Sequence, residues 1–343
     1  MTTSTSIFGL ADHIRRCASG AHLHEEEVRE AIGLIMDGGA TQAQMSALLV
    51  AMRVNGETTD EVVGAARAMR ERALLVECHR RPLMDVCGTG GDGAGSFNIS
   101  TAVAFVVAGA GVAVAKHGNR AMSSNCGSAD VIEALGVDLE SVSSHAHSLL
   151  ERHGIAFLFA QLHHPAMRVV APVRREIGIR TLFNLLGPLT NPANITHQVV
   201  GVAHENTLQL MADALRALGR KRAAVVHAAD GMDEVSLASA TRVVEWDGTQ
   251  FITYIIAPEM FGLKRRPAGE TAGGSPAVNA QLIEQVLAGW PGPHRDVVLL
   301  NAGLALYIAG SSHDIGDGVS AAQRSIDSGA ARRALRMLVE TKA

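Results

Sequence analysis

The amino-acid sequence predicts an α/β protein: a small all-helical N-terminal domain, then a larger α/β domain whose central, mostly parallel sheet is flanked by helices. Two features indicate this class. Residues up to about 75 read as helices only, and from Leu83 onward short apolar strands alternate with helical segments. With 47% hydrophobic and 19% charged residues among 343, the chain can bury a core, which excludes wholesale disorder.

The N-terminal helices are predicted from their periodicity and their capping signals. Residues 24–36 place their apolar side chains on one helical face. Thr41–Gln44 and Thr58–Glu61 match the capping box, each opening an apolar-periodic run, and Asn55–Gly56 between them is a turn signal. So small a layer has too little surface to cover these apolar faces, and we expect it to dock on the rest of the chain or on a second copy.

The larger domain is predicted from alternating strand and helix patterns. The pattern predicts strands at 83–87, 112–116 and 223–228, helices at 101–109, 129–135 and 208–218, a β-hairpin at 241–256 turning at Asp247–Gly248, a mostly helical tail at 278–339, and an exposed loop at 267–276.

Charge and composition exclude several classes of protein. The net charge of −4 argues against binding nucleic acid or an anionic membrane through bulk charge. Four cysteines without a C-x-x-C pair support neither a zinc ribbon nor a disulfide scaffold. Residues 93–115 carry no charge over a transmembrane length, but Gly109 and Gly111 interrupt them, so a buried helix followed by a buried strand is the better interpretation. With no signal peptide at the N-terminus, we expect a soluble, cytoplasmic protein.

A glycine-rich loop follows the first predicted strand. Gly88, Gly90 and Gly93 satisfy the dinucleotide pattern G-x-G-x-x-G, but no acidic residue follows about 20 positions later to hold a ribose diol. The second strand ends instead in Lys116, and a cation there suits a phosphate. A Walker sequence is absent as well, because no Gly-Lys-Ser/Thr follows the loop.

The residues around this loop suit an anion. Backbone amides at the start of the next helix, with the hydroxyls of Ser96, Ser100 and Thr101, would form a cradle for phosphate oxygens. A glycine turn that merely joins strand to helix remains the alternative. The segment 116–120, Lys-His-Gly-Asn-Arg, and the serines after it weigh against that alternative, because cations and hydroxyls beside glycines suit a multiply charged phosphate ligand.

These segments together resemble the anthranilate phosphoribosyltransferase family. The resemblance rests on motifs that cover essentially the whole chain in order: Gly88-Thr-Gly-Gly-Asp92, Asn98-Ile-Ser-Thr101, Lys116-His-Gly-Asn-Arg120, the run from Arg174 to Pro192, Gly231-Met-Asp-Glu-Val235 and Arg295 to Gly303. It implies a helical dimerisation domain at 1–76, joined by a segment around 165–190. It also implies a catalytic domain at 77–164 and 191–343 that binds 5-phosphoribosyl 1-diphosphate.

The resemblance also implies three sets of site residues. The expected phosphoribosyl diphosphate ligands are Gly88, Gly91, Asp92, Ser96, Asn98, Ile99, Ser100, Thr101, Lys116, His117, Gly118, Asn119, Arg120, Ser123, Ser124 and Ser128. Gly88, Asn119 and Arg174 are expected to contact anthranilate. Ser100, Asp233 and Glu234 are expected to hold Mg²⁺, whose preference for oxygen ligands fits adjacent carboxylates, although a solvated acidic turn is the alternative for those two residues.

The activity implied is transfer of the phosphoribosyl group to the amine of anthranilate, in tryptophan biosynthesis, by a magnesium-dependent homodimer that binds neither nucleic acid nor membranes. No general base is identified: His117 is a candidate, although a histidine in this setting is more often structural. One alternative is a pyrimidine-nucleoside phosphorylase, whose loop reads Lys-His-Ser-Thr-Gly-Gly. The other is a non-enzymatic relative that binds nucleic acid, which should be basic, whereas this chain has a pI of about 6.4.

Overall fold

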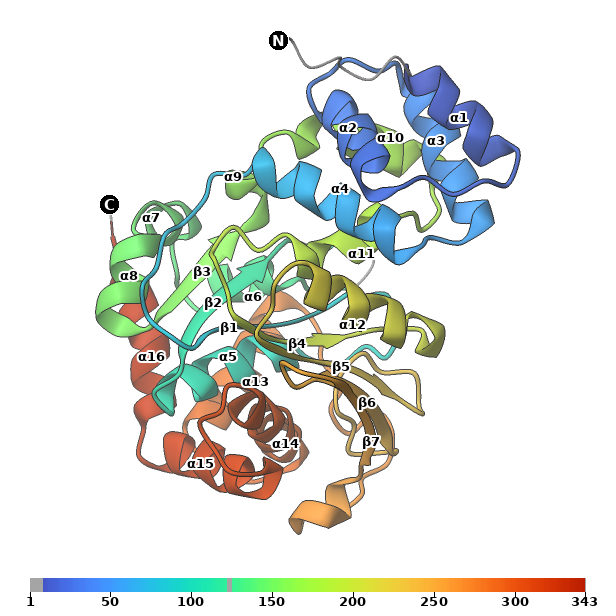
Figure 1. The fold of residues 1–343 in the computed structure, drawn as a ribbon. Helices are drawn as coiled ribbons and strands as arrows, with labels where there is room; N and C mark the ends of the chain where they lie inside the picture. The colour runs from blue at the N-terminus through green and yellow to red at the C-terminus, as the bar shows by residue number, and fades with distance from the viewer. Residues whose placement is uncertain (1–8, 122–124, 343) are drawn as a thin grey trace. The chain divides into compact units, whose positions relative to one another are not determined.

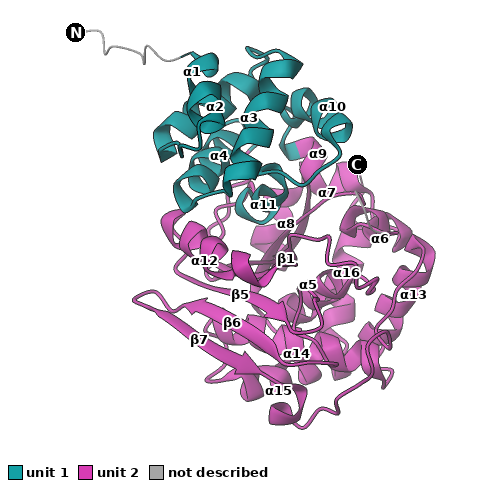
Figure 2. Ribbon diagram, turned by 90° about the vertical axis from the view of Figure 1, so that its right-hand side faces the viewer, with its two compact units in different colours: residues 1–74, 163–190 teal, residues 75–162, 191–343 magenta. Residues whose placement is uncertain are grey.

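The computed structural model describes residues 9–121 and 125–342. The chain divides into two compact units (Figure 2). Unit 1 comprises Met1–Leu74 and His163–Thr190, and unit 2 comprises Leu75–Leu162 and Asn191–Ala343. Unit 1 is helical and unit 2 contains a seven-stranded, mostly parallel sheet, which confirms the predicted fold class.

Unit 1 is a helical layer in which two chain segments pack together (Figure 2). Its helices are α1 (Leu10–Ala18), α2 (Glu25–Met36), α3 (Gln42–Asn55), α4 (Thr59–Glu71), α10 (Met167–Ile177), α11 (Phe183–Leu186) and the 3₁₀ helix η1 (Gly187–Leu189). The short helix α9 (Ala160–His163) ends where the second segment of the unit begins. Helix α10 packs on α2 and α3, and α11 packs on α4.

The predicted capping signals in unit 1 are confirmed. Thr41 and Thr58 each accept a hydrogen bond from the backbone N–H three residues on, and Gln44 and Glu61 bond back to the caps. Helix α3 ends at Gly56, whose φ of 79° favours glycine. The apolar face predicted for α2 is buried throughout. These local signals therefore determine where the helices begin and which face they bury.

The sheet of unit 2 runs in the order β3-β2-β1-β4-β5-β6-β7. Its strands are β1 (Leu83–Gly88), β2 (Ala113–Gly118), β3 (Ile155–Phe159), β4 (His197–Gly201), β5 (Arg222–Ala228), β6 (Thr241–Trp246) and β7 (Phe251–Ile256). The first five strands pair in parallel, and β6 and β7 are antiparallel. The predicted strands and the predicted hairpin are all present.

Helices cover both faces of this sheet (Figure 1). They are α5 (Ile99–Gly109), α6 (Ser128–Ala134), α7 (Leu139–Ser144), α8 (Ala146–His153), α12 (Leu208–Ala217), α13 (Pro276–Leu287), α14 (Pro293–Ile308), α15 (Ile315–Asp327) and α16 (Ala330–Val339), with 3₁₀ turns η2 (Glu205–Thr207) and η3 (Pro258–Phe261). Helix α5 packs on β1 and β2 and against α14 and α16, whereas α12 packs on β5 and β6. Because the β1–β2 and β4–β5 crossovers run in opposite directions along the sheet, right-handed connections place α5 and α12 on opposite faces.

The strands β3 and β4 were not predicted from the sequence. The β3 segment is a continuous apolar run of five residues, and such a run is not distinguished from buried helix by its periodicity. The β4 segment, which begins with His197 and Gln198, shows little alternation. The uncharged stretch 93–115 forms α5 and the start of β2, as predicted. Across residues 9–121 and 125–342, the structure contains no helix with the length and apolar character needed to span a bilayer.

Candidate active site

Three loops of unit 2 meet at the carboxyl edge of its parallel strands. The glycine loop (residues 88–98) follows β1, and the acidic loop (residues 229–240) follows β5. The lysine loop ends β2 and follows it, and its described residues are 116–121 and 125–128. The chain leaves β1 toward β2 on one side, whereas β4 lies on the other side of β1. Ligands of open α/β sheets bind where the strand order reverses in this way, so the sheet itself indicates the position of the site.

Close packing of the acidic loop explains two glycines at this edge. Gly88 and Gly201 are register partners at the ends of β1 and β4. A Cβ on Gly88 would lie 2.4 Å from Asp233 Oδ2, and one on Gly201 would lie 1.4 Å from the Asp233 carbonyl oxygen. The backbone N–H of Gly90 donates to Asp233 Oδ2 (2.8 Å). Glycine is therefore required here so that a carboxylate can approach the strand ends.

Lys116 is buried beneath the glycine loop. Its ammonium group donates to the Val86 carbonyl oxygen (2.8 Å) and to Ser100 Oγ (3.2 Å). Burial lowers the pKa of Lys116, while the nearby Asp85 carboxylate opposes that shift. The ammonium group thus links β1, the start of α5 and the end of β2.

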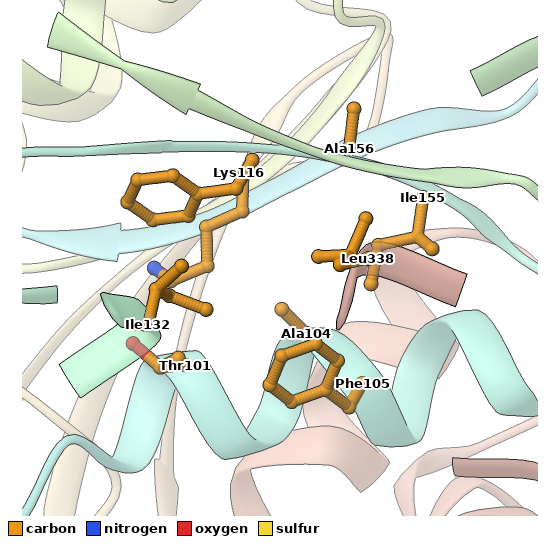
Figure 3. Close-up of a pocket in the computed structure, with 9 residues that line it drawn as sticks. Thr101, Ala104, Phe105, Lys116, Ile132, Ile155, Ala156 and Leu338 are labelled. Atoms are coloured by element: carbon orange, nitrogen blue, oxygen red, sulfur yellow. The ribbon is translucent and has the colours of Figure 1, made fainter. Parts of the chain in front are cut away.

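The stem of Lys116 lies in apolar surroundings that hold it in place. Together with Thr101 and seven apolar side chains it lines a cavity of about 10 Å³ between α5, β2 and β3 (Figure 3). A cavity of that size holds at most one water molecule, so it is not a substrate site. Its walls instead restrict the lysine side chain.

The first turn of α5 is satisfied within the protein. The backbone N–H of Ile99 donates to the Phe97 carbonyl oxygen (2.6 Å), and the N–H of Thr101 donates to the Asn98 carbonyl oxygen (3.1 Å). Two of the amides that the sequence offered as an anion cradle are therefore already engaged. The Ser100 backbone acts to lower the pKa of Glu234, as expected for a carboxylate near a helix N-terminus, where a negative charge is stabilised.

Asp92, Asp233 and Glu234 form an acidic cluster, in which one oxygen from each side chain lies within 4.8 Å of the others. Burial, together with the charge of Asp92, raises the pKa of Asp233 to about 6. Burial and the two aspartates also raise the pKa of Glu234 well above its usual range. Among the described residues, Glu234 Oε2 has no hydrogen-bond partner although it is buried. Such oxygens fit a hard divalent cation such as Mg²⁺.

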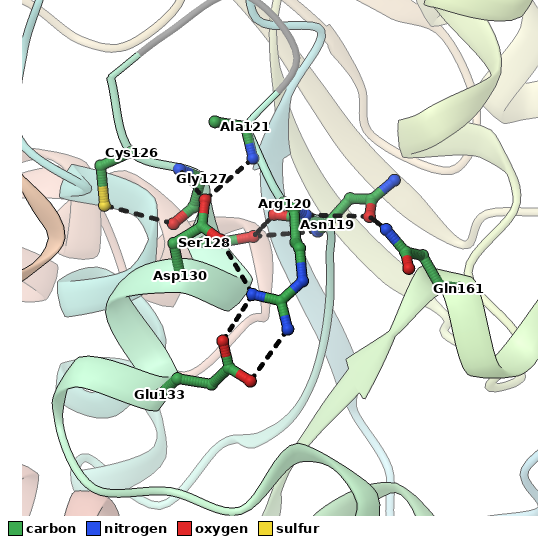
Figure 4. Close-up of polar contacts among 9 residues, drawn as sticks. All are labelled: Asn119, Arg120, Ala121, Cys126, Gly127, Ser128, Asp130, Glu133 and Gln161. Atoms are coloured by element: carbon green, nitrogen blue, oxygen red, sulfur yellow. Dashed lines mark hydrogen bonds and ion pairs between the residues drawn. The ribbon is translucent and has the colours of Figure 1, made fainter. Parts of the chain in front are cut away.

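The lysine loop is held by its own polar contacts (Figure 4). The Arg120 guanidinium pairs with both Glu133 oxygens and with Asp130, and Asp130 also accepts from the backbone N–H groups of Ala121 and Gly127 (2.9 Å each). The Ser128 hydroxyl accepts from the Asn119 backbone N–H (3.1 Å). In this structure the side chains of Arg120 and Ser128 thus brace the loop. The expected ligands Ser123 and Ser124 lie outside the described residues.

The structure gathers most of the expected residues at one edge of unit 2. Gly88, Gly91, Asp92, Ser96, Asn98, Ile99, Ser100 and Thr101 come from the glycine loop and the start of α5. Lys116, His117, Gly118, Asn119, Arg120 and Ser128 come from the lysine loop and the start of α6, and Asp233 and Glu234 come from the acidic loop. His117 is buried, and its backbone N–H donates to Asp85 (3.3 Å).

Arg174 belongs to unit 1, on α10. Its guanidinium lies over the Phe183 ring, 5.6 Å from the ring centre, and burial lowers its pKa. It has no ion-pair partner within the ranges that the structure describes. Its neighbour Arg175 is exposed. A half-buried guanidinium without a carboxylate is unusual for a purely structural arginine.

Sequence reasoning missed a buried network beneath the site. The Asp85 carboxylate accepts from the Asn191 amide (2.9 Å), and that amide also donates to the Ala115 carbonyl oxygen (2.7 Å). Burial raises the pKa of Asp85, against the pull of Lys116. The one available signal was an acidic residue in the middle of an otherwise apolar strand, because a charge there needs polar partners.

Comparison with known proteins gives the class: the chain matches a family of glycosyltransferases. The glycosyl transferase family a/b domain matches residues 80–332, and the helical bundle domain of the same family matches residues 11–73.

Individual relatives identify the family to which the chain belongs within this class of protein. The chain is 51% identical to the anthranilate phosphoribosyltransferase of Symbiobacterium thermophilum over 95% of this chain and 96% of that one. It is 48% identical to that of Desulforamulus reducens over 96% of each chain. The structure of the Thermus thermophilus enzyme aligns with a TM-score of 0.91 at 47% identity, over 96% of this chain and 98% of that one. The chain belongs to the anthranilate phosphoribosyltransferase family.

A more distant structure contains ligands. The Saccharomyces cerevisiae anthranilate phosphoribosyltransferase in complex with PRPP (5-phosphoribosyl 1-diphosphate) and Mg aligns with a TM-score of 0.89 at 29% identity, over 97% of each chain.

Proposed function

We propose that this protein transfers the phosphoribosyl group of 5-phosphoribosyl 1-diphosphate to the amine of anthranilate in a magnesium-dependent reaction of tryptophan biosynthesis. The observation that carries the proposal is the meeting of the glycine, lysine and acidic loops at the strand edge. It supplies hydroxyls, a buried ammonium group and a cluster of carboxylates to one ligand. The yeast relative that binds PRPP and Mg supports this choice of ligand.

The phosphoribosyl diphosphate would lie on the glycine and lysine loops. Lys116 supplies a fixed positive charge, and the hydroxyls of Ser96 and Thr101 supply neutral donors. These groups act by positioning and by electrostatic stabilisation of the developing charge.

Asp233, Glu234 and the Ser100 hydroxyl would hold Mg²⁺, with Asp92 near enough to share in binding. The orphaned, buried Oε2 of Glu234 and the mutual repulsion of three carboxylates fit that ion. When bound, Mg²⁺ would offset negative charge on the diphosphate as it leaves. The protein's own part is to keep the carboxylates close together. Because burial raises their pKa values, the bound cation would favour their ionised form.

Anthranilate would contact Gly88, Asn119 and Arg174. A guanidinium suits the anthranilate carboxylate because it donates two parallel hydrogen bonds. The likeness to the yeast enzyme in complex with 4-fluoroanthranilate, at a TM-score of 0.88 and 28% identity over 97% of each chain, supports an aromatic acid as the acceptor.

The reaction forms one bond and breaks another at C1 of the ribose. The amine lone pair attacks C1 from the face opposite the diphosphate, the C1–O bond breaks, and the amine releases a proton. An aniline nitrogen is neutral at pH 7, so no strong base is required. His117 remains the candidate acceptor for that proton, and solvent is the alternative.

We also propose a cytoplasmic homodimer formed through the helices of unit 1. Exposed apolar side chains on this unit support the dimer: Val54 is 78% exposed, and Leu34 and Ile179 are also exposed. Light scattering should give twice the chain mass of 36.0 kDa. A mass of one chain at micromolar concentration would refute the dimer.

The activity is tested by the fluorescence of anthranilate. Purified protein should consume anthranilate only when both 5-phosphoribosyl 1-diphosphate and magnesium are present. Omission of either one is the control. Steady fluorescence, together with phosphorolysis of thymidine, would refute the proposal in favour of a pyrimidine-nucleoside phosphorylase.

A further inference from the structure

A short segment of unit 2, far from the glycine loop in sequence, runs beside that loop where it leads into α5. We call residues 271–274 the strap. The backbone N–H of Phe97 donates to the Thr271 carbonyl oxygen (3.1 Å), and the N–H of Gly273 donates to the Gly95 carbonyl oxygen (2.9 Å). Ser96 and Ala272 form an antiparallel bridge. The exposed loop expected at 267–276 is therefore paired with the glycine loop through its middle.

The pairing leaves no room for a side chain at Gly273 of the strap. A Cβ on Gly273 would lie 2.6 Å from Phe97 Cα. The Phe97 ring is buried and meets the His294 ring edge to face, with 4.9 Å between ring centres. The His294 imidazole also hydrogen-bonds the Ala272 carbonyl oxygen (3.2 Å). The strap and residues 95–97 of the glycine loop thus pack together.

Asn279, the fourth residue of α13, joins this unit to the start of α5. Its side chain is 2% exposed. Its Oδ1 accepts from the Gly274 backbone N–H (2.7 Å), and its Nδ2 donates to Asn98 Oδ1 (2.9 Å). Asn98 Nδ2 in turn donates to the Cys126 carbonyl oxygen (3.2 Å). One chain of hydrogen bonds therefore runs from the strap through two asparagines to the lysine loop.

Asn98 occupies the position from which α5 begins. With φ −72° and ψ 69°, it forms an inverse γ-turn, closed by the bond from the Ile99 N–H to the Phe97 carbonyl oxygen. The carbonyl oxygen of Asn98 accepts from the N–H groups of Thr101 and Ala102. The orientation of Asn98 thus determines where Ser100 and Thr101 lie.

We propose that Asn279 is a positioning residue for the phosphoribosyl diphosphate: acting through Asn98, it holds the glycine loop and the lysine loop at the separation that the ligand requires. This inference rests on the proposed function of the two loops. Asn279 itself contacts the strap, Asn98 and Cys126, and it is not among the residues expected to bind substrate. Its side chain must both accept and donate, which asparagine does and aspartate does not.

Two substitutions separate this role from simple packing. Asn279→Asp keeps an acceptor for the Gly274 N–H but removes the donor to Asn98, and Asn279→Ala removes both without adding charge. Each should raise the KM for 5-phosphoribosyl 1-diphosphate about tenfold, which corresponds to about 1.4 kcal/mol. The KM for anthranilate should rise less, by about twofold, because Gly88 and Asn119 of the two loops would contact it but its carboxylate would pair with Arg174 on α10; a twofold change is well below the tenfold change that about 1.4 kcal/mol represents.

The matched control is Ser325→Ala. Ser325 is as buried as Asn279, and its hydroxyl donates to the Val106 carbonyl oxygen (2.8 Å) near the other end of α5. This variant should lose thermal stability with an unchanged KM for both substrates. Calorimetric titration of 5-phosphoribosyl 1-diphosphate with magnesium gives a second readout that does not depend on turnover.

The outcomes are distinct. An unchanged KM and an unchanged affinity for the diphosphate donor in Asn279→Ala, with a melting temperature lowered as in the control, would make Asn279 merely structural and overturn the inference. A wild-type protein that neither binds the donor nor consumes anthranilate would instead overturn the proposed function. If Asn279→Asp does not fold, Asn279→Ala carries the test.

Discussion

Unit 2 contains two groups of carboxylates, each with one cation. In the first group Asp233 and Glu234 lie near Lys116. In the second group Asp130 and Glu133 lie beside Arg120. In the first group burial raises the pKa of both acids, and the ammonium group bonds to Val86 and Ser100 instead of to them. In the second group the Arg120 guanidinium pairs directly with both acids.

The two groups respond differently to burial. Burial also tends to raise the pKa of Asp130, but the N–H groups of Ala121 and Gly127, and then Arg120, outweigh it and hold this pKa below its usual range. In the second group each carboxylate is therefore paired with the guanidinium, whereas in the first group the carboxylates have no cation bonded to them in the part of the chain that the structure describes. The same residue types brace a loop in one place and form a candidate metal site in the other.

The largest effect is expected from removing charge in the first group. Asp233→Asn with Glu234→Gln keeps an acceptor for the Gly90 N–H group but removes both negative charges. Turnover should fall more than about a hundredfold, equivalent to about 2.7 kcal/mol in the barrier, because the ligands of Mg²⁺ are lost. Steady-state rates across a magnesium titration measure this.

The melting temperature of the double variant is the control, because it shows whether the fold survives the substitutions. The variant should melt at or above the wild-type temperature without magnesium, since it relieves repulsion between buried carboxylates. Near-normal rates at low magnesium would instead return Asp233 and Glu234 to the role of a solvated acidic turn.

The pH dependence of stability should differ between the two groups. The folded pKa of Asp233 is raised from 3.8 to about 6, so folding favours its protonated form. Above pH 6 the ionised carboxylate then destabilises the fold by up to about 3 kcal/mol, because each tenfold change in proton affinity corresponds to about 1.36 kcal/mol. This destabilisation is absent below about pH 4, near the unfolded pKa.

Asp233→Asn removes that destabilisation. Denaturant unfolding without magnesium should find the variant more stable than wild type at pH 8 and equal to it at pH 4. A difference that does not vary with pH would show that burial does not disfavour the ionised Asp233 carboxylate. Asp130→Asn should show the opposite trend, since the depressed pKa of Asp130 contributes stability that is lost as pH falls.

Local sequence signals predicted much of the fold and part of the site. Thr41, Thr58 and Gly56 determine helix ends in unit 1 through contacts only a few residues long, so the sequence revealed them. Lys116 was identified because a cation beside glycines at the end of a strand suits a phosphate, whereas the role of Asp233 came from the resemblance to the family. The partners of these residues come from distant segments: Asn191 reaches Asp85 across 106 positions, and Asn279 reaches Asn98 across 181. No local pattern encodes such pairs.

Two arginines also differ in whether they have carboxylate partners. Arg120 is paired with carboxylates, whereas Arg174 has only the Phe183 ring as a partner among the described residues. A charge-assisted bond to the carboxylate of anthranilate is worth about 1.5–3 kcal/mol. Arg174→Ala should therefore raise the KM for anthranilate roughly ten- to a hundredfold and leave that for the diphosphate donor nearly unchanged.

The exposed neighbour Arg175, about 100° around the helix, provides the control. Arg175→Ala should change neither KM in initial-rate measurements. Equal effects of the two substitutions on both substrates would mean that Arg174 serves only the packing of unit 1.

The smallest effect is expected where charges are already paired and exposed. Glu133→Gln breaks the bidentate pair with Arg120, in which both side chains are 43% exposed. Exposed pairs of this kind contribute about 0.2–1 kcal/mol, and salt screens them. Urea unfolding should therefore show a loss within that range at low salt, shrinking toward zero at about 1 M salt, where the screening length is about 3 Å. Turnover should stay close to that of wild type, because Asp130 still holds the N–H groups of Ala121 and Gly127. A loss of several kcal/mol that salt does not reduce would mean that this group, like the acidic cluster, is effectively buried, and the contrast between the two would fail.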